Sequence, residues 1–375
     1  MKPPVVFVIL QTGALANGGL QSITELMGRL KDHRPIVLTN LDSDFARAWR
    51  DHGIDVHVVP EDASAGLRGN LARTVQSYAR YHRALRQILA ASGARIVHAN
   101  DPLSFQLAVA AARLSRARIV LNLRDTIDPG RKPPTVKFRA IFAAADHVLY
   151  LSDDMAERWR QVAGNATRSC STTYSIVDPE RFSPAGPAAD AGRIVLVPGI
   201  FWPKKGQLEF IGKVVPALAE RGIESWFAGD FEPHANPYAA ACAEAAKPHA
   251  EWVRFLGHRD DLPALYRQAS VIAVPSRHEG LMRGMIEAMS CGRPVVSFDV
   301  CSAREVLEEK SATAGTVVAH GDHRGMADAL VRYATDPAAQ AAAGRAGRAA
   351  AEVLFDPDAV VERYERVYRV LGEDR

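Results

Sequence analysis

In this 375-residue chain, the leading candidates for binding a ligand are two glutamates, Glu279 and Glu287, which lie eight positions apart. Glu279 lies in a polar turn, and Glu287 lies in the helical pattern that follows it. At 3.6 residues per turn, Glu287 projects within roughly 80° of the direction in which the helix starts. Two carboxylates beside a phosphate would repel it, so we expect both to accept hydrogen bonds from hydroxyl groups. A sugar nucleotide offers hydroxyls on both sides of its diphosphate.

The elements around the two glutamates are those of a parallel sheet. An apolar run at 271–274 precedes the turn, and a second apolar run at 295–298 follows the helical pattern. Strand, helix and strand in this order predict a βαβ unit. Open α/β sheets bind ligands at the carboxyl ends of their strands, where a helix start also presents unpaired N–H groups. The turn that carries Glu279 is therefore expected at a ligand-binding edge.

The same stretch resembles part of a known enzyme family. PSRHEGLMRGMIEAMSCGRPVV is similar to the Glu-x7-Glu segment of the retaining family-4 glycosyltransferases, typically PSxxEGxxxxxxEAMAxGxPVV. The spacing, the Glu-Gly and Glu-Ala-Met words and the closing Gly-x-Pro-Val all match. The alternative is that Glu279 caps a helix and Glu287 is a solvated side chain. The resemblance covers most of the chain and is strongest between Val195 and Leu307.

The resemblance implies transfer of a sugar from a nucleotide diphosphate donor to an acceptor hydroxyl, with retention of the anomeric configuration. Glu279 would hold hydroxyls of the donor sugar and Glu287 the ribose. Positions 279 and 287 lie about 12 Å apart along a helix, whereas two glycosidase carboxylates achieve retention at about 5 Å. We therefore expect displacement on one face of an ion pair rather than attack by a glutamate. The donor-binding residues expected are Gly18, Gly19, Gly199, Arg259, Gly280, Leu281, Met282, Arg283 and Glu287.

The loop that should hold the diphosphate departs from the family pattern. That pattern is Gly-Arg, four residues and Lys-Gly, and here Gly199 and Lys205 match but Ile200 stands in the place of the arginine. One of two cations is therefore missing, and Lys204, Arg277 or Arg283 could replace it. Lys205, the helix start and the amides of residues 280–282 would then stabilise the leaving diphosphate. The alternative for Lys205 is an ordinary surface lysine.

Polar residues also end two predicted strands in the amino-terminal half. His98 and Asn100 end one, and Arg124 and Asp125 follow the other. The family often has His-x-His at the first edge, and many members have a histidine near the reacting sugar where Arg124 stands. The resemblance assigns His98 and Asn100 to the acceptor, although a structural role for His98 is equally open. The catalytic candidates are Glu279, Lys205, Arg124 and Asp125.

Two further motifs bear on the donor. Gly18-Gly19 follows the first apolar run and would let backbone N–H groups approach a phosphate, as in the family, although an ordinary tight turn also explains it. Asp42-Ser43-Asp44 could be the metal-binding DxD motif of the other large glycosyltransferase fold. Asp44 is also well placed to cap a helix at 45–52. We expect no metal and no cofactor, only the nucleotide sugar as donor.

Composition fits a globular cytoplasmic protein. Hydrophobic residues make up 47% and charged residues 24% of the chain, and the length suits two domains. The four cysteines form no metal spacing, which fits a reducing compartment. The apolar run near the amino terminus is too short for a signal peptide or a membrane span. We expect a cytoplasmic protein with no nucleic-acid partner.

The amino-terminal half is basic. Residues 1–185 hold 24 Lys and Arg against 17 Asp and Glu, and no acidic residue occurs between Ala63 and Asn100. Apolar residues recur there at three- and four-residue steps, which predicts an amphipathic helix with an arginine-rich outer face. Such a face can attach to anionic lipid at the inner face of the cell membrane, and a merely solvated face is the alternative. The segment to test for membrane contact is 63–139.

The whole pattern predicts an α/β protein with two Rossmann-like domains that face a cleft, the GT-B fold. We expect an acceptor-binding domain at 1–185, a donor-binding domain at 186–355, and a helix at 356–375 that packs back across the junction. The resemblance implies synthesis of bacterial cell-surface polysaccharide or glycolipid, with a glycan or lipid-linked glycan as acceptor. The alternatives are a sugar-nucleotide epimerase, a glycan phosphorylase and a catalytically silent subunit that binds nucleotide sugar.

Overall fold

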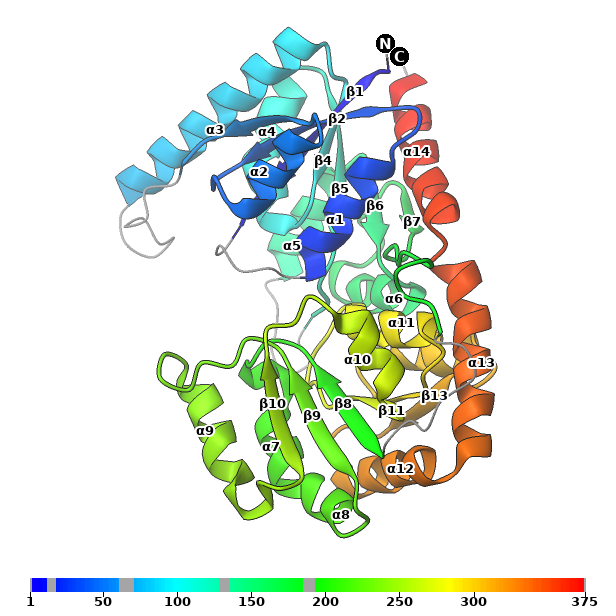
Figure 1. Ribbon diagram of the computed structural model, residues 1–375. Helices are drawn as coiled ribbons and strands as arrows, with labels where there is room; N and C mark the ends of the chain where they lie inside the picture. The colour runs from blue at the N-terminus through cyan, green and yellow to red at the C-terminus, as the bar shows by residue number, and fades with distance from the viewer. Residues whose placement is uncertain (1, 12–17, 61–70, 128–134, 185–192, 374–375) are drawn as a thin grey trace. The chain divides into compact units, whose positions relative to one another are not determined.

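The computed structural model describes residues 2–11, 18–60, 71–127, 135–184 and 193–373. It divides into two compact units, one formed by Met1–Ile176 with Pro357–Arg375 and the other by Val177–Asp356 (Figure 1). The predicted domain boundary at 185 lies outside the described residues.

The first unit is built on a seven-stranded parallel sheet in the order β3-β2-β1-β4-β5-β6-β7. Its central strands are almost continuously hydrophobic, as expected for parallel strands that are covered on both faces. The strand order reverses between β1 and β4, which makes this the switch point of the sheet. The strands are β1 (Pro4–Ile9), β2 (Arg34–Thr39), β3 (Asp55–Val58), β4 (Ile96–Ala99), β5 (Arg118–Leu123), β6 (His147–Tyr150) and β7 (Cys170–Thr172).

The helices of the first unit begin at side-chain caps where the sequence offers them. Asp101 and Ser152 accept hydrogen bonds from the first backbone N–H groups of the helices that follow them. The predicted cap Asp44 is wrong by one residue, because the Ser43 hydroxyl accepts from the N–H of Ala46. The helices are α1 (Gly18–Arg29), α2 (Asp44–Asp51), α3 (Leu71–Ser92), α4 (Pro102–Leu114), α5 (Thr135–Ala144), α6 (Asp153–Ala163) and α14 (Pro357–Glu373).

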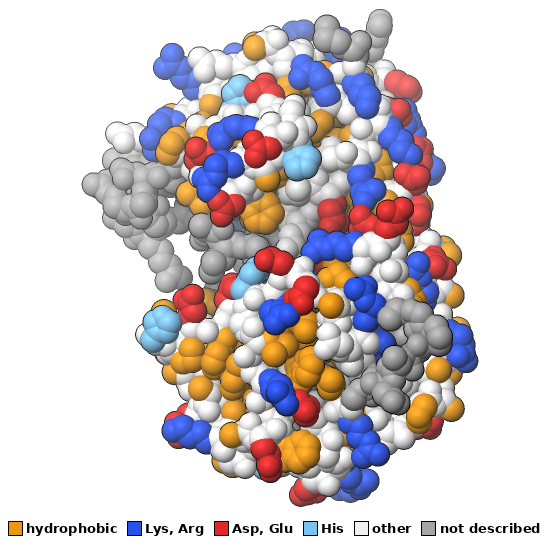
Figure 2. All heavy atoms as spheres, viewed as in Figure 1, with side chains coloured by type: hydrophobic (Ala, Val, Ile, Leu, Met, Phe, Trp, Pro, Cys, Tyr) orange, Lys and Arg blue, Asp and Glu red, His pale blue; other side chains and the backbone are white. Residues whose placement is uncertain are grey.

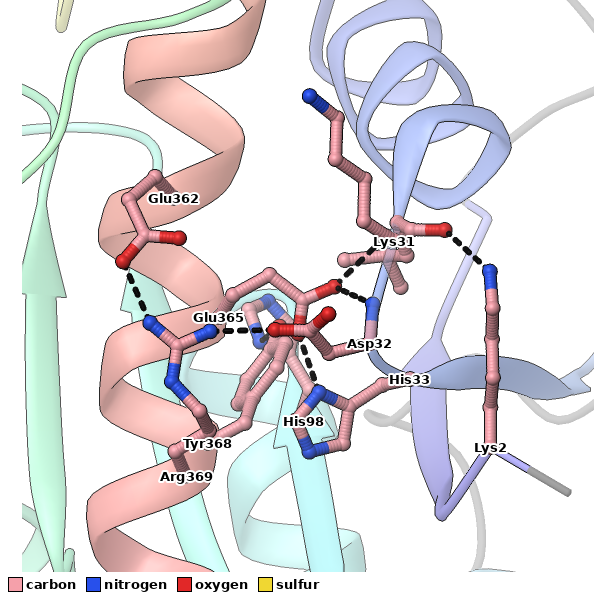
Figure 3. Close-up of polar contacts among 10 residues, drawn as sticks. Lys2, Lys31, Asp32, His33, His98, Glu362, Glu365, Tyr368 and Arg369 are labelled. Atoms are coloured by element: carbon pink, nitrogen blue, oxygen red, sulfur yellow. Dashed lines mark hydrogen bonds and ion pairs between the residues drawn. The ribbon is translucent and has the colours of Figure 1, made fainter.

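The last helix, α14, belongs to the first unit, as predicted. Its apolar face, which includes Val360, Tyr364 and Tyr368, is buried in the core that also contains residues of β1 and α1. A polar cluster fixes the same helix. Glu365 is buried and accepts from the backbone N–H groups of Lys31 and Asp32 at 2.9 Å each, while its other oxygen contacts His33 (Figure 3). The carboxyl-terminal helix is therefore tied to the turn that precedes β2.

The second unit holds a six-stranded parallel sheet in the order β10-β9-β8-β11-β12-β13. Its switch point lies between β8 and β11. The strands β11 and β12 span the two apolar runs that the sequence predicts. The strands are β8 (Ile194–Pro198), β9 (Glu224–Ala228), β10 (Val253–Gly257), β11 (Val271–Val274), β12 (Val295–Phe298) and β13 (Gly315–Val318).

Helices flank these strands along the chain of the second unit, as in a doubly wound fold. They are η1 (Pro203–Lys205), α7 (Gln207–Lys213), α8 (Val215–Ala219), α9 (Pro237–Ala246), η2 (Lys247–His249), α10 (Leu262–Gln268), α11 (Arg283–Ser290), η3 (Glu305–Glu309), α12 (His323–Thr335) and α13 (Pro337–Leu354). Both units are thus the Rossmann-like α/β structures that the sequence predicts. Within the described residues, no helix combines the length and the hydrophobicity that crossing a membrane requires.

Candidate active site

The catalytic candidates Lys205 and Glu279 meet at the switch point of the second sheet. β8 and β11 are parallel neighbours, so the loops that follow them leave the same edge of the sheet. Lys205 Nζ lies 2.6 Å from Glu279 Oε1, and both side chains are largely buried. Open α/β sheets bind their ligands at this kind of edge. A cation and a carboxylate are thus placed together where the fold expects a ligand.

Glycines allow these two loops to approach each other. Gly206 has a φ of +72°, and a Cβ at this position would lie 2.1 Å from the carbonyl oxygen of Pro275. The N–H of Arg277 donates to the carbonyl of Lys204 at 2.7 Å. Gly199, at the end of β8, has a φ of +138°, a conformation that other residues rarely adopt. The glycine that follows Lys205 is therefore needed for the close approach of the two loops that carry Lys205 and Glu279.

The second glutamate is held by two neighbours. Glu287 is 4% exposed; its Oε1 accepts from Arg283 Nε at 3.0 Å and its Oε2 accepts from the Tyr266 hydroxyl at 3.0 Å. Burial raises the pKa of Tyr266 well above its usual value, and the nearby Glu287 carboxylate adds to the rise, so the phenol stays protonated and donates. The solvated-side-chain alternative for Glu287 is therefore wrong. Glu279 does not cap α11 either, because the N-cap residue is Met282.

The other donor-side candidates differ in what they can offer. Gly280 precedes α11, and the side chains of Leu281 and Met282 are buried, so these three residues present backbone rather than side chains. Arg259 is engaged by Asp261 through two hydrogen bonds of 2.6 and 2.7 Å. Ile200, which replaces the expected cation, is 40% exposed.

The three cations named as replacements for that arginine are placed differently. The Arg277 side chain pairs with Glu209. Arg283 lies at the first turn of α11 against Glu287. Lys204 lies in η1 next to Lys205. Arg283 is thus the candidate that the structure joins directly to a predicted donor residue.

The amino-terminal candidates lie in the first unit. Asn100 and Arg124 end the neighbouring strands β4 and β5; Asn100 is buried, and Arg124 donates to Ser175 Oγ at 3.5 Å. Asp125 is exposed. Gly18 and Gly19 open α1, at the switch point of the first sheet, but residues 12–17 of their loop lie outside the described residues.

His98 is fully buried and faces α14 rather than solvent. Its Nδ1 lies 2.9 Å from the Tyr368 hydroxyl, and its ring lies against Phe7 with 4.8 Å between centroids. Burial, with a smaller contribution from the charge of Arg124, lowers its pKa to about 3, so the ring is neutral at physiological pH. Acceptor contact by His98 remains a prediction, and this burial weighs against it.

The DxD triplet is engaged by arginines. Asp42 pairs with Arg50, and Asp44 pairs with Arg47. Among the residues that the structure describes, no group of three or more His, Cys, Asp and Glu side chains is arranged to hold a metal ion.

Two family models match the chain over successive segments. The model described as "Glycosyl transferase 4-like domain" matches residues 18–170, and the model described as "Glycosyl transferases group 1" matches residues 192–336. The chain belongs to the group 1 glycosyltransferases.

Curated relatives resemble parts of this glycosyltransferase chain. The lipopolysaccharide core biosynthesis mannosyltransferase LpsB of Rhizobium meliloti is 30% identical over 32% of this chain and 35% of its own length. A GDP-mannose-dependent monoacylated alpha-(1-6)-phosphatidylinositol monomannoside mannosyltransferase of Corynebacterium glutamicum is 25% identical over 61% of this chain and 63% of its own. The chain thus spans less than two thirds of the length of these relatives.

Solved structures resemble the whole chain. HepE of Anabaena, in complex with UDP and glucose, has a TM-score of 0.79 at 20% identity and covers 97% of this chain and 98% of its own. Sucrose-phosphate synthase of Thermosynechococcus elongatus has a TM-score of 0.82 at 18% identity, with all of both chains covered. The likeness establishes the fold, which is the GT-B fold that the sequence predicts.

Tyr266, which contacts the candidate donor residue Glu287, is not among the residues that the sequence predicts for the site. Its helix, α10, precedes β11, and its hydroxyl meets Glu287 only because α10 and α11 lie next to each other. The signal that the sequence offers is an aromatic residue with a polar tip after the apolar start of this helix, LPALY.

Replacing Glu287 with alanine is expected to raise the KM for the donor more than it lowers kcat. A contact with the non-reacting part of the donor acts equally in the ground state and the transition state. The loss of a charged acceptor is worth about 1.5–3 kcal/mol, or roughly 10- to 100-fold in KM. Tyr266→Phe should show the same pattern at smaller size, about 3-fold. Steady-state kinetics against donor concentration checks both.

Tyr333→Phe is the matched control for Tyr266→Phe. Tyr333 is also a buried tyrosine of the second unit, and its hydroxyl bonds to Thr316 at 3.1 Å, away from the glutamates. The KM of Tyr333→Phe for the donor should stay at the wild-type value. An unchanged donor KM in Glu287→Ala would count against the assignment of this residue to the donor.

Proposed function

We propose that the protein is a retaining, metal-independent glycosyltransferase that moves a hexose from a nucleotide diphosphate to an acceptor hydroxyl. The contact between Lys205 and Glu279 at the switch point of the second sheet carries this proposal. It supports the proposal because a lysine, which suits a leaving diphosphate, lies next to a carboxylate, which suits sugar hydroxyls, at the switch point of the sheet. Membership of the group 1 glycosyltransferases supports the same reaction.

The chemistry requires little from the protein beyond charge and position. As the bond between the anomeric carbon and the diphosphate oxygen breaks, negative charge collects on that oxygen, and Lys205 and the start of α11 are placed to stabilise it. The acceptor oxygen then bonds to the anomeric carbon from the same face, and the acceptor proton passes to the departing diphosphate. Glu279 orients the sugar and does not form a bond to it.

For the substrates, we infer a glycan or lipid-linked glycan acceptor and a product in cell-surface polysaccharide or glycolipid. Support comes from relatives named for lipopolysaccharide core and for phosphatidylinositol monomannoside. One relative is named as GDP-mannose-dependent and one structure is named as a UDP and glucose complex, so both nucleotides belong in the first test.

The deciding experiment is a panel of sugar nucleotides that is scored for thermal stabilisation and then for transfer. A ligand at 100 times its dissociation constant stabilises the folded protein by about 2.7 kcal/mol. Stabilisation by a donor, together with transfer to a glycan, supports the proposal. Stabilisation without transfer or hydrolysis of any donor favours a silent binding subunit, which the Ile200 and Arg124 departures also favour. Consumption of donor without any acceptor would point to an epimerase.

Turnover is expected to survive chelation of divalent metal ions by excess EDTA. The diphosphate charge is met by Lys205 and backbone N–H groups, and the acidic residues of the DxD triplet are paired with arginines in the first unit. Initial rates with and without chelator measure this. Loss of turnover that Mn²⁺ or Mg²⁺ restores would revive Asp42 and Asp44 as metal ligands.

Membrane association is expected to be peripheral and to weaken as salt rises. On α3, Arg80, Arg83 and Arg86 are exposed opposite a buried face, and Lys137 and Arg139 are exposed on α5. The predicted contributors Arg68, Arg131 and Lys132 lie outside the described residues. Figure 2 shows one face of the protein, on which Lys and Arg side chains lie among Asp and Glu side chains.

Vesicle sedimentation with anionic lipid tests this attachment. Binding should fall as ionic strength rises from about 0.05 to 0.5 M, because screening shortens the range of each charge. Arg80→Glu with Arg83→Glu and Arg86→Glu should abolish it. No binding to anionic vesicles, or binding that salt leaves unchanged, would favour a soluble acceptor.

A further inference from the structure

The loop after β8 carries an unusual amount of exposed apolar surface. Among the described residues, six large hydrophobic side chains are prominently exposed, and two of them are Ile200, at 40%, and Trp202, at 57%. They lie within one three-residue stretch that leads directly into η1 and Lys205. The remaining four are dispersed over α4, α5, α13 and α14, at Leu114, Val136, Val353 and Val370.

The backbone of residues 200–202 is fixed by packing and hydrogen bonds, so the exposure of Ile200 and Trp202 does not result from a poorly held loop. Phe201, between the two, is buried in an aromatic cluster with Phe227, Phe231 and Phe255. Each backbone carbonyl of the stretch is occupied. Gln207 donates to the carbonyl of Ile200 at 2.8 Å, Asn236 to that of Phe201 at 2.9 Å, and the N–H of Lys205 to that of Trp202 at 2.8 Å.

We propose that Trp202, with Ile200 beside it, is a stacking platform for the hexose ring of the donor. This inference rests on the proposed function and adds a binding residue to that site. One face of a hexose ring consists of C–H groups, and covering an indole with it removes apolar surface from water. A rigid platform loses little conformational entropy when the ring binds.

The position of the platform favours the donor sugar over other occupants. The same short segment ends in Lys205, which touches Glu279, and these two residues are placed to meet the diphosphate and the sugar hydroxyls. An apolar side chain at 200, where the family pattern has a cation, suits an uncharged ring and not a phosphate. The residues predicted for the acceptor belong to the other unit. A nucleobase, which also stacks on indole, is the competing occupant that the test must separate.

The test compares sugar nucleotides with the bare nucleotides, UDP-glucose against UDP and GDP-mannose against GDP, by calorimetric titration. Trp202→Ala should weaken binding of the sugar nucleotide that the wild type accepts by about 10-fold. Its affinity for the bare nucleotide should not change. Trp202→Phe, which keeps an aromatic face, should stay within about 3-fold of wild type. Val353→Ala, at another exposed apolar residue of the second unit, should bind as wild type does.

If Trp202→Ala loses the same affinity for the sugar nucleotide and for the bare nucleotide, the indole contacts the base and the proposal is overturned. Unchanged binding of both would also overturn it. Failure of the proposed function is read separately, on the wild-type protein, as the absence of binding or of transfer with any donor. Because Trp202 is exposed, the Trp202→Ala protein should melt at the wild-type temperature, which excludes unfolding as the cause of weaker binding.

Discussion

Lys205→Ala is expected to lower kcat by about 100-fold or more, the usual effect of removing one donor that stabilises a developing oxyanion. Charge that collects on the departing diphosphate needs a cation, and Lys205 is the residue of the β8 loop that the structure joins to Glu279. With Ile200 in the place of the usual arginine, this lysine carries a larger share than it would in a site with two cations. The measurement is kcat at saturating donor.

The lysine also neutralises Glu279, so its removal has a second consequence. Glu279 is 7% exposed, and a buried carboxylate that loses its partner destabilises the folded protein. Lys205→Met combined with Glu279→Gln removes both charges and should restore the melting temperature while leaving turnover low. Recovery of turnover in the double variant would show that the single variant was merely unfolded.

Three variants, Lys205→Ala, Arg283→Ala and Ile200→Arg, distinguish a diphosphate bound at the β8 loop from one bound on the α11 side. If the phosphate lies against the β8 loop, Lys205→Ala should be the more damaging alanine variant. Ile200→Arg should improve donor affinity at most modestly, because the added charge replaces the apolar contact proposed for Ile200. If Lys205→Ala keeps more than about half of the wild-type turnover while Arg283→Ala abolishes it, the phosphate is held from the α11 side. The assignment of the β8 loop from the sequence pattern would then be wrong.

The fold could be predicted from the sequence because each local signal agreed with the next. Continuous apolar runs that end at Pro275 and before residue 299 give β11 and β12 almost residue for residue. The helical period between them gives α11, with Glu287 on it. Parallel strands buried on both faces leave such runs, because no alternation is needed.

Contacts between distant residues could not be predicted in the same way. Lys205 and Glu279 are 74 positions apart, and they meet because β8 and β11 are neighbours across the switch point. Only the family resemblance placed them in one site. Tyr266 and Glu287 likewise meet through the packing of α10 on α11. The burial of His98 depends on α14, whose Tyr368 lies 270 positions further along the chain.

Glu365→Ala is expected to destabilise the first unit by about 3–5 kcal/mol, the usual cost of removing one partner from a buried ion pair. Glu365 is 1% exposed, and its loss would leave His33 and the N–H groups of Lys31 and Asp32 without their acceptor inside the protein. Figure 3 shows these donors converging on the carboxylate from the turn before β2. Thermal and urea unfolding, followed separately for the two units, would measure the effect.

Glu362→Ala is the matched control, one turn earlier on α14. Glu362 pairs with Arg369 at the surface, so its loss should cost less than about 1 kcal/mol. Equal destabilisation by the two variants would mean that α14 is held by its apolar face alone. That result would remove the role assigned to the buried cluster.

The pH dependence of the difference between wild type and Glu365→Ala identifies its electrostatic part. Burial alone would raise the pKa of Glu365, but the bond to His33 and the backbone donors lower it further than burial raises it. Its stabilising effect is therefore present above the unfolded-state pKa of about 4.3 and is lost as the pH falls through the lower pKa of the folded state. The buried His98, with a pKa of about 3, destabilises wild type and variant alike below about pH 6.5, so it cancels in the difference. The difference in free energy of unfolding between the two proteins should stay constant from neutral pH to about pH 5 and should narrow below about pH 4.3. A difference that persists at lower pH would assign the stabilisation to packing.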